Sequence, residues 1–300
     1  MTAGVAVLLF AFGASLALGF VLRAERFGKR FLDQPNHRSL HEVPVPRSGG
    51  LAIHAAFGLA VLWFHAMSLP MPGAGFWISW LLVVAVSAGD DLRHVPVAVR
   101  LGAHMAAAAL LLWTLGGIGP SPLITLLAGV LLVWFMNLFN FMDGMDGLAG
   151  LMAMMGASCL AVAGLIQGDT AYALLLFAIA AVAGGFLFHN LPPARLFMGD
   201  AGSVGLGFLL GAASLYGMSR NLFDWFVPVL AFLPFIADAT YTLAMRVRRG
   251  HRPWQAHREH LYQRLVLAGQ PVRKVLVIEF LIMLACQLAA LLIMIMHGSV

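Results

Sequence analysis

The chain has 300 residues, of which 61% are hydrophobic and only 10% are charged. Soluble domains carry about 25% charged residues, so this composition excludes a soluble globular protein and indicates an integral membrane protein. The net charge of +5 favours anionic lipids and anionic ligands. Because the basic residues are not interleaved with aromatic ones, no nucleic acid is expected as a partner.

Apolar stretches long enough to cross a bilayer recur along the whole chain. A helix needs about 20 apolar residues for one crossing. The sequence predicts ten spans, at residues 3–22, 50–69, 75–89, 97–116, 122–142, 148–167, 170–189, 202–219, 224–245 and 274–297. We therefore expect an all-α polytopic bundle of about ten transmembrane helices that forms a single domain over residues 1–300. No basic residue precedes the first span, so it is expected to be retained and not cleaved as a signal peptide.

The basic residues orient this bundle. If residues 23–49 are cytoplasmic, seventeen of the eighteen Lys and Arg residues fall on the cytoplasmic side, and Arg220 alone falls outside. Cytoplasmic loops of membrane proteins are enriched in Lys and Arg, so both termini are expected to be periplasmic. The same arrangement predicts an active site on the cytoplasmic face, where the ends of the spans carry Asp90, Asp91, Asp143, Asp146 and Asp200.

The loop between the first two spans carries two arginines that suit phosphate binding. Prolines and glycines stiffen it around Arg38 and Arg47, and a guanidinium group can offer fork-like contacts to phosphate oxygens. A loop that only sets membrane orientation is the alternative.

Gly89-Asp90-Asp91 ends the third predicted span. Adjacent carboxylates on a helix point about 100° apart, so at least one of them must meet water, a cation or a basic partner. Pairing with Arg93 or Arg100 is the structural alternative to a catalytic role.

Two amides and two carboxylates close the fifth span, within residues 137–148. Asn137, Asn140 and Asp143 recur every three residues and share one broad helix face, and the glycines that follow permit a break before Asp146. Buried unpaired carboxylates are costly in a membrane. The stretch predicts a helix that ends near Asp143, then a short turn, forming either the floor of a site or a polar helix end that meets water.

Asp200 stands among glycines in the segment 197–205, at the start of the eighth span. Backbone N–H groups at a helix start point outward and favour anions, so this segment suits a phosphate and metal site. A helix cap with small-residue packing is the alternative.

The last loop carries His257 and His260 three residues apart, after Arg252. No third ligand is nearby and the surrounding arginines would repel a cation, so hydrogen bonding to an anionic ligand is preferred over zinc binding. Asp238, inside the ninth predicted span, is expected to face the bundle interior, where it either pairs with a loop arginine or faces and supports the site.

Five of these segments together resemble one known family, the polyprenyl-phosphate N-acetylhexosamine-1-phosphate transferases of glycosyltransferase family 4. The segments are His41 to Gly50, Gly89-Asp90-Asp91, Asn137 to Leu148, Met198 to Gly205, and the loop with its histidines and arginines. Muramoyl-pentapeptide members carry three consecutive histidines in the last loop and Thr-Pro-Thr-Met-Gly-Gly in the first. This chain has His257-Arg258-Glu259-His260 and Pro44 to Gly50 there, so it resembles the branch that initiates O-antigen and common antigen.

The resemblance implies transfer of N-acetylhexosamine 1-phosphate from a UDP-sugar to undecaprenyl phosphate. The products would be an undecaprenyl-diphosphate-sugar and UMP, in the first membrane step of bacterial cell-surface polysaccharide synthesis. It implies a Mg²⁺ requirement, with Mn²⁺ as an alternative, and a multi-pass location in the bacterial inner membrane. Membrane lipids are the remaining partners, and a homodimer is left open.

The resemblance also assigns roles to single residues. It implies Asp200 as a metal ligand with the side-chain oxygen of Asn140 nearby. It implies catalytic roles for Asp90, Asp91, Asp143 and Asp146. The expected substrate-binding residues are Arg38, Arg47, Asn137, Arg252, His257 and His260, although the deeper position of Asn137 also suits it to holding the turn in shape.

Three alternatives remain at this stage. A muramoyl-pentapeptide type of reaction would use the same chemistry with another donor. A CDP-alcohol phosphotransferase would need an Asp-Gly…Ala-Arg…Gly…Asp signature, and Ala-Arg occurs only at Ala194-Arg195 without that framing. A transporter with a carboxylate relay would need polar groups at the membrane midplane, whereas these acids lie at one face.

Overall fold

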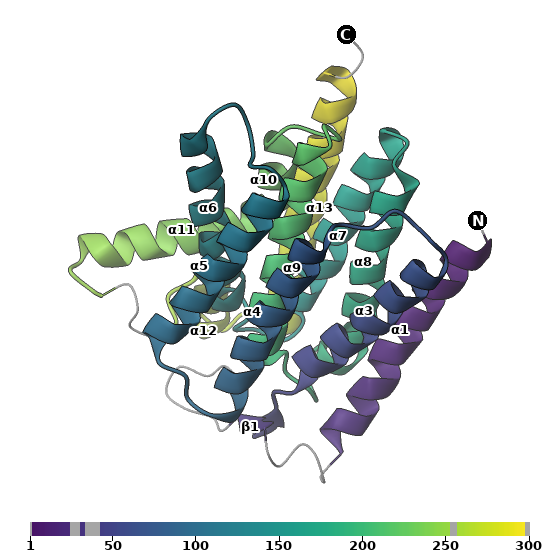
Figure 1. The fold of residues 1–300 in the computed structure, drawn as a ribbon. Helices are drawn as coiled ribbons and strands as arrows, with labels where there is room; N and C mark the ends of the chain where they lie inside the picture. The colour runs from purple at the N-terminus through teal and green to yellow at the C-terminus, as the bar shows by residue number, and fades with distance from the viewer. Residues whose placement is uncertain (1, 25–30, 34–42, 253–256, 298–300) are drawn as a thin grey trace.

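A computed structural model of the protein describes residues 2–24, 31–33, 43–252 and 257–297. Within these ranges the chain is almost entirely helical (Figure 1). The helices are α1 (Thr2–Arg23), α3 (Gly49–Ala66), α4 (Ala74–Leu92), α5 (Val97–Thr114), α6 (Pro122–Phe141), α7 (Leu148–Ile166), α8 (Thr170–Asn190), α9 (Gly199–Ser219), α10 (Phe226–Ala231), α11 (Leu233–Arg248), α12 (Leu261–Leu267) and α13 (Val272–His297).

Nine of the described helices are long and apolar enough to cross a membrane, namely α1, α3 to α9 and α13. They correspond to nine of the ten predicted spans, so the protein is a multi-pass membrane protein as predicted. The N-terminal end of α1 and the C-terminal end of α13 both lie at the end of the bundle opposite β1 (Figure 1).

The prediction of one continuous span at 224–245 is wrong. The chain there forms two helices, α10 and α11, separated at Phe232, and α11 lies across the bundle (Figure 1). Pro234 is in the first turn of α11, and proline cannot donate a backbone hydrogen bond to the carbonyl four residues earlier. In addition, Asp238, Thr242 and Arg246 form a buried polar stripe along α11, which a helix exposed to lipid would not carry.

The centre of the bundle is made by α7, α8 and α9, whose facing surfaces are rich in glycine and alanine. In the most apolar stretch of α9, 78% of the residues are buried, against 22% in α1 and in α13. Small residues let helix backbones approach closely in membranes, where van der Waals packing replaces the hydrophobic effect between helices. Large apolar side chains instead point outward from α1, α6 and α13, as expected for helices that face lipid.

A clasp of backbone hydrogen bonds joins the start of α3 to the start of α9. Gly49 N donates to Phe197 O at 2.9 Å, Gly50 N donates to Met198 O at 2.8 Å, and Phe197 N donates to Pro46 O at 2.7 Å. Beside it, β1 (Leu32–Asp33) pairs antiparallel with β2 (Val45–Pro46). The clasp fixes the first loop against the segment that carries Asp200.

Candidate active site

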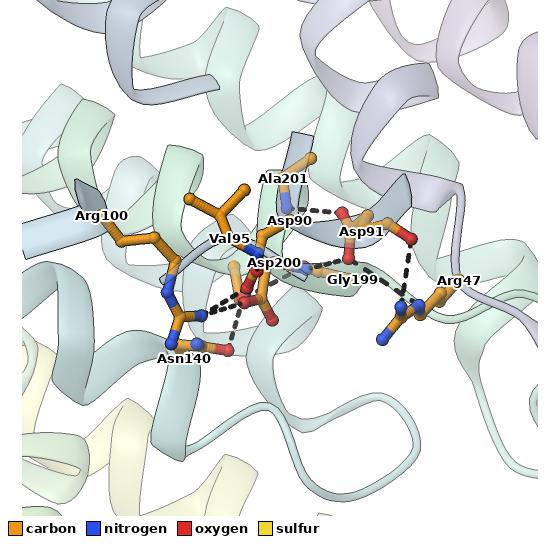
Figure 2. Close-up of polar contacts among 10 residues, drawn as sticks. Arg47, Asp90, Asp91, Val95, Arg100, Asn140, Gly199, Asp200 and Ala201 are labelled. Carbon is orange, nitrogen blue, oxygen red and sulfur yellow. Dashed lines mark hydrogen bonds and ion pairs between the residues drawn. The ribbon is translucent and has the colours of Figure 1, made fainter. Parts of the chain in front are cut away.

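The ends of α4, α6 and α9 bring their aspartates together at one end of the bundle. Asp90 and Asp91 lie in the last turn of α4, Asp200 lies in the first turn of α9, and Asp143 follows the end of α6. Figure 2 shows the carboxylates of α4 and α9 in contact with two arginines. Electrostatic interactions connect Asp143 to Asp200, Asp91 and Asp146.

Asp91 serves as the cap of α9. No side chain of its own segment caps this helix. Instead, Asp91 Oδ1 accepts a hydrogen bond from Asp200 N at 2.9 Å and Oδ2 accepts one from Ala201 N at 2.8 Å. The sequence analysis predicted that the backbone N–H groups at the start of α9 would bind a phosphate. This prediction is corrected for Asp200 N and Ala201 N, because both donate to Asp91. These two hydrogen bonds hold the first turn of α9 against the Asp91 carboxylate and so fix the position of the Asp200 backbone.

Arg47 holds Asp91 from the other side. Its Nη2 donates to the backbone oxygen of Asp91 at 3.0 Å, and its Nε lies 3.9 Å from Asp91 Oδ1. The Arg47 side chain is 38% exposed, so these contacts cover it only in part.

Arg100, in the first turn of α5, bridges Asp90 and Asp200 (Figure 2). Its Nη1 forms an ion pair with Asp90 and another with Asp200 Oδ2, at 3.1 Å. Asp90 Oδ1 also accepts a hydrogen bond from Val95 N at 2.7 Å. The structural alternative for the Asp-Asp pair is therefore partly confirmed, with Arg100 and Arg47 as the partners.

Of the two spaced amides, only Asn140 joins the cluster. Its Oδ1 accepts a hydrogen bond from Ser203 Oγ at 3.0 Å, one turn along α9 from Asp200. Asn137 donates its amide N–H to Val133 O of its own helix at 2.7 Å. This contact lies within α6 and does not reach the turn, so both roles predicted for Asn137, binding substrate and holding the turn in shape, stay predictions.

The turn after α6 has the form that its glycines predict. The helix ends at Phe141, two residues before Asp143, and Gly147 has a left-handed φ of 80°. Gly147 N donates to Asn190 Oδ1 at 2.9 Å, and Asp146 Oδ2 accepts from Ala194 N at 2.9 Å. Asp146 thus ties the turn to the loop between α8 and α9.

Asp143 remains half-buried at the head of this turn. Burial, followed by the negative charge of Asp200 and of the other neighbouring carboxylates, raises the pKa of Asp143 well above its ordinary value. A group in this environment ionises readily only when positive charge approaches it.

The histidine loop forms a second polar cluster around Asp238. Asp238 Oδ1 lies 3.2 Å from His260 Nδ1, and Asp238 also accepts from Leu261 N and from Thr242 Oγ1. The rings of His257 and His260 have centroids 4.9 Å apart. Burial, and then the neighbouring His260, lowers the pKa of His257 to about 4, so His257 is neutral at physiological pH.

Tyr262 connects this loop to the aspartate turn. Its ring stacks on His260 with centroids 5.8 Å apart, and its hydroxyl donates to Phe141 O at 3.4 Å. A Cβ on Gly144 would lie 2.4 Å from the Tyr262 hydroxyl oxygen and 2.9 Å from Gln263 Nε2. Glycine is therefore needed at position 144 for α12 to pack against the turn.

The structure thus brings together most of the residues predicted for the site, and leaves some apart. Arg252 lies exposed beyond the end of α11, and Arg38 lies outside the described residues. The sequence did not single out Ser203 or Tyr262, and considered Arg100 only as an ion-pair partner. A hydroxyl one turn after Asp200 and a basic residue opening an apolar helix are the signals that would have pointed to Ser203 and Arg100.

The charges and oxygen atoms of the cluster suit a divalent cation. Five aspartates and two arginines make up the cluster, and carboxylates this close together are stabilised by a bound cation or by a proton. Among the described residues, no group of three or more His, Cys, Asp or Glu side chains is arranged to hold a metal. Mg²⁺ usually takes one or two protein oxygens and completes its shell with phosphate oxygens and water, so the predicted Mg²⁺ requirement stays a prediction that depends on bound substrate.

Comparison with known proteins decides the family. The sequence profile described as Glycosyl transferase family 4 matches residues 74–218. Decaprenyl-phosphate N-acetylglucosaminephosphotransferase of Mycolicibacterium smegmatis is 31% identical over 88% of this chain and 75% of its own length. The chain therefore belongs to glycosyl transferase family 4.

Two further members are similar over most of their length. Undecaprenyl-phosphate alpha-N-acetylglucosaminyl 1-phosphate transferase of Yersinia pestis is 29% identical over 95% of this chain and 82% of its own. The probable undecaprenyl-phosphate N-acetylglucosaminyl 1-phosphate transferase of Bacillus subtilis is 26% identical over 84% of this chain and 74% of its own length. The family resemblance inferred from the motifs is confirmed, and these names agree with the glycan-initiating branch.

Proposed function

We propose that this protein transfers N-acetylglucosamine 1-phosphate from UDP-N-acetylglucosamine to undecaprenyl phosphate, giving undecaprenyl-diphosphate-N-acetylglucosamine and UMP. The observation that carries the proposal is the cluster of Asp90, Arg100 and Asp200 at one end of a membrane helix bundle. Family membership supports the reaction class, and the names of the three relatives support the sugar and the polyprenyl phosphate. The product would begin the synthesis of a bacterial cell-surface polysaccharide.

The reaction in this proposal is a direct in-line displacement at the β-phosphorus of the donor. An oxygen of the acceptor phosphate forms the new O–P bond as the bond to the UMP oxygen breaks. A phosphate monoester has a second pKa near 6, so the acceptor is already largely dianionic at neutral pH and needs little help from a base. Asp90, fixed by Arg100 and Val95, orients the acceptor or takes up a residual proton, and no covalent enzyme intermediate forms.

Asp200 would hold a Mg²⁺ ion, with the side-chain oxygen of Asn140 nearby and Mn²⁺ as an alternative metal. When bound, the ion would neutralise charge on the donor diphosphate and on the departing UMP. Asp91 keeps the Asp200 backbone in place through the cap of α9, and Asp146 keeps the turn that carries Asp143 in place.

The histidine loop would bind the nucleotide part of the donor. Neutral His257 can donate or accept one hydrogen bond without adding charge, and His260 is oriented by Asp238. Tyr262 packs this loop against the aspartate turn. Donor binding and the reacting phosphates would therefore share one continuous surface.

The proposed location is the bacterial inner membrane, with the site facing the cytoplasm and both chain ends facing the periplasm. The basic residues support this orientation, because seventeen of the eighteen lie on the site side of the ten-span topology predicted from the sequence. The division of the segment 224–245 into α10 and α11 leaves this partition unchanged, since the chain after α11 is back at the site end, where Tyr262 contacts Phe141. A cytoplasmic site would also give direct access to a soluble UDP-sugar.

UMP release by the purified protein tests the function. We expect UMP and a lipid diphosphate sugar from UDP-N-acetylglucosamine and undecaprenyl phosphate with Mg²⁺, and little product from UDP-N-acetylgalactosamine or UDP-muramoyl-pentapeptide. Asp200→Asn should lose activity, whereas Asp169→Asn, which alters an ion pair with Arg220 far along α9, should retain it. Full activity of Asp200→Asn, or isolation of a phosphorylated aspartyl enzyme, would refute the mechanism, and faster turnover of another donor would refute the sugar.

A further inference from the structure

The guanidinium group of Arg100 has a buried N–H that the aspartates do not use. Nη1 contacts both Asp90 and Asp200, but the buried Nε has no hydrogen-bond partner among the described residues. A buried donor without an acceptor costs about 1–3 kcal/mol, and such groups in native proteins need a specific explanation.

One turn further along α5, the buried side chain of His104 has ring nitrogens without a hydrogen-bond partner among the described residues. Its side chain is only 4% exposed, and neither ring nitrogen has a hydrogen-bond partner within the described part of the chain. The buried His54 differs, because Trp80 Nε1 donates to its Nδ1 at 3.2 Å and its Nε2 lies 2.9 Å from Ala201 O. Burial alone therefore does not explain two unpartnered nitrogens at His104.

The helix geometry places the Nε–H of Arg100 and the ring of His104, which both lack a hydrogen-bond partner within the described ranges, on the same side of α5. Residues 100 and 104 are at positions i and i+4 of α5, where side chains are neighbours on one face. His104 interacts electrostatically with Arg100. A neutral imidazole nitrogen is a good acceptor for a guanidinium N–H, and a hydrogen bond to a charged group is stronger than one between neutral groups.

We propose that His104 is a positioning residue for Arg100 in the transfer reaction, accepting the Nε–H directly or through one water when substrates bind. The inference rests on the proposed function and deepens it. Both substrates are anions that compete with Asp90 and Asp200 for the Nη groups of Arg100. A second anchor at Nε keeps the guanidinium plane in place while the Nη groups exchange partners.

A packing role makes the opposite prediction. His104 lies on the face of α5 that also carries Ala107, Ala108 and Leu111, all buried. If the ring only filled space, leucine would replace it with equal activity and, by removing an unpartnered polar group, with equal or higher stability.

The experiment compares His104→Leu and His104→Gln in the full-length protein in detergent. Activity is measured as UMP release, and folding is measured by thermal unfolding. We expect kcat of His104→Leu to fall between about tenfold and about a hundredfold, the range for losing one hydrogen bond to a charged group, with KM for UDP-N-acetylglucosamine within about twofold. His104→Gln keeps an acceptor and should recover most of kcat. Ser79→Ala removes another unpartnered buried polar group, on α4, and should leave kcat unchanged.

A double-mutant cycle with Arg100→Lys tests whether His104 acts through Arg100. Lysine has no group equivalent to Nε, so the effect of His104→Leu on kcat should largely disappear in the Arg100→Lys background. Additive losses in the cycle, or wild-type kcat in His104→Leu, would overturn the inference while leaving the proposed function intact. Wild-type protein that releases no UMP from any donor would overturn the proposed function and this inference together.

Discussion

Replacing Asp91 should damage the fold as much as the chemistry, unlike replacing its neighbour Asp90. In Asp91→Ala the first turn of α9 loses two charge-assisted hydrogen bonds, of 2.9 and 2.8 Å. Each is worth about 1.5–3 kcal/mol, so the predicted loss of unfolding free energy is about 3–6 kcal/mol. At ~2 °C per kcal/mol for a chain of this length, the unfolding temperature should fall by about 6–12 °C.

Tryptophan fluorescence during thermal unfolding in detergent measures this loss, since the chain has seven tryptophans. Asp90→Asn is the comparison variant, because its amide oxygen can still accept from Val95 N and Arg100 keeps its ion pair with Asp200 when it loses the one with Asp90. We expect that variant to lose activity with a much smaller change in unfolding temperature. An Asp91→Ala protein that unfolds at the wild-type temperature but is inactive would refute the capping argument and would make Asp91 a directly catalytic residue.

Three other predictions concern packing, backbone strain and pH. Gly50→Ala should strongly destabilise the protein, because the new Cβ would lie 2.1 Å from Gly202 N, a backbone atom that cannot move away; Gly13→Ala, with no atom within 4 Å, is the thermal-shift control. Gly147→Ala should cost about 1–2 kcal/mol in denaturant unfolding, because its φ of 80° disfavours a side chain. Burial lowers the pKa of His257 from 6.5 to about 4. As the pH falls from about 6.5 toward 4, the unfolded state therefore takes up a proton at His257 before the folded state does, and the folded state loses stability. Unfolding temperatures measured across this window should therefore depend less on pH in His257→Gln, and an unchanged slope would contradict the assignment.

Much of the fold was predictable because a bilayer allows few solutions. An apolar stretch of span length must be a helix there, since every backbone group has to be satisfied within the segment. The same rule failed at 224–245, where hydropathy was high enough but Pro234 divides the segment and the polar stripe of α11 turns toward protein. Proline and the spacing of Asp238, Thr242 and Arg246 were visible in the sequence, whereas the orientation of α11 depends on tertiary contacts.

The candidate site was predictable as a set of residues but not as a set of roles. Spacing along a helix indicated that Asn140 and Asp143 share a face, and the structure agrees to within two residues on where α6 ends. Spacing could not show that Asp91 caps a helix more than a hundred residues later, or that Tyr262 packs on Gly144, because both contacts join segments distant in sequence. For the same reason the sequence suggested Arg100 only as a partner of Asp90 and Asp91, and not as a bridge to Asp200.

The cap of α9 has a consequence for the biogenesis of the protein. Asp91 and its two backbone donors are separated by 109 and 110 residues, so the donors do not exist when α4 leaves the ribosome. Until α9 is inserted, the end of α4 must remain at the water boundary, where its carboxylates are hydrated. Chains truncated before residue 199 would lack both the cap and Asp200, and the clasp between α3 and α9 would also be absent. Insertion of α9 is therefore the step at which the first loop, α4 and the Asp200 carboxylate become one assembled unit.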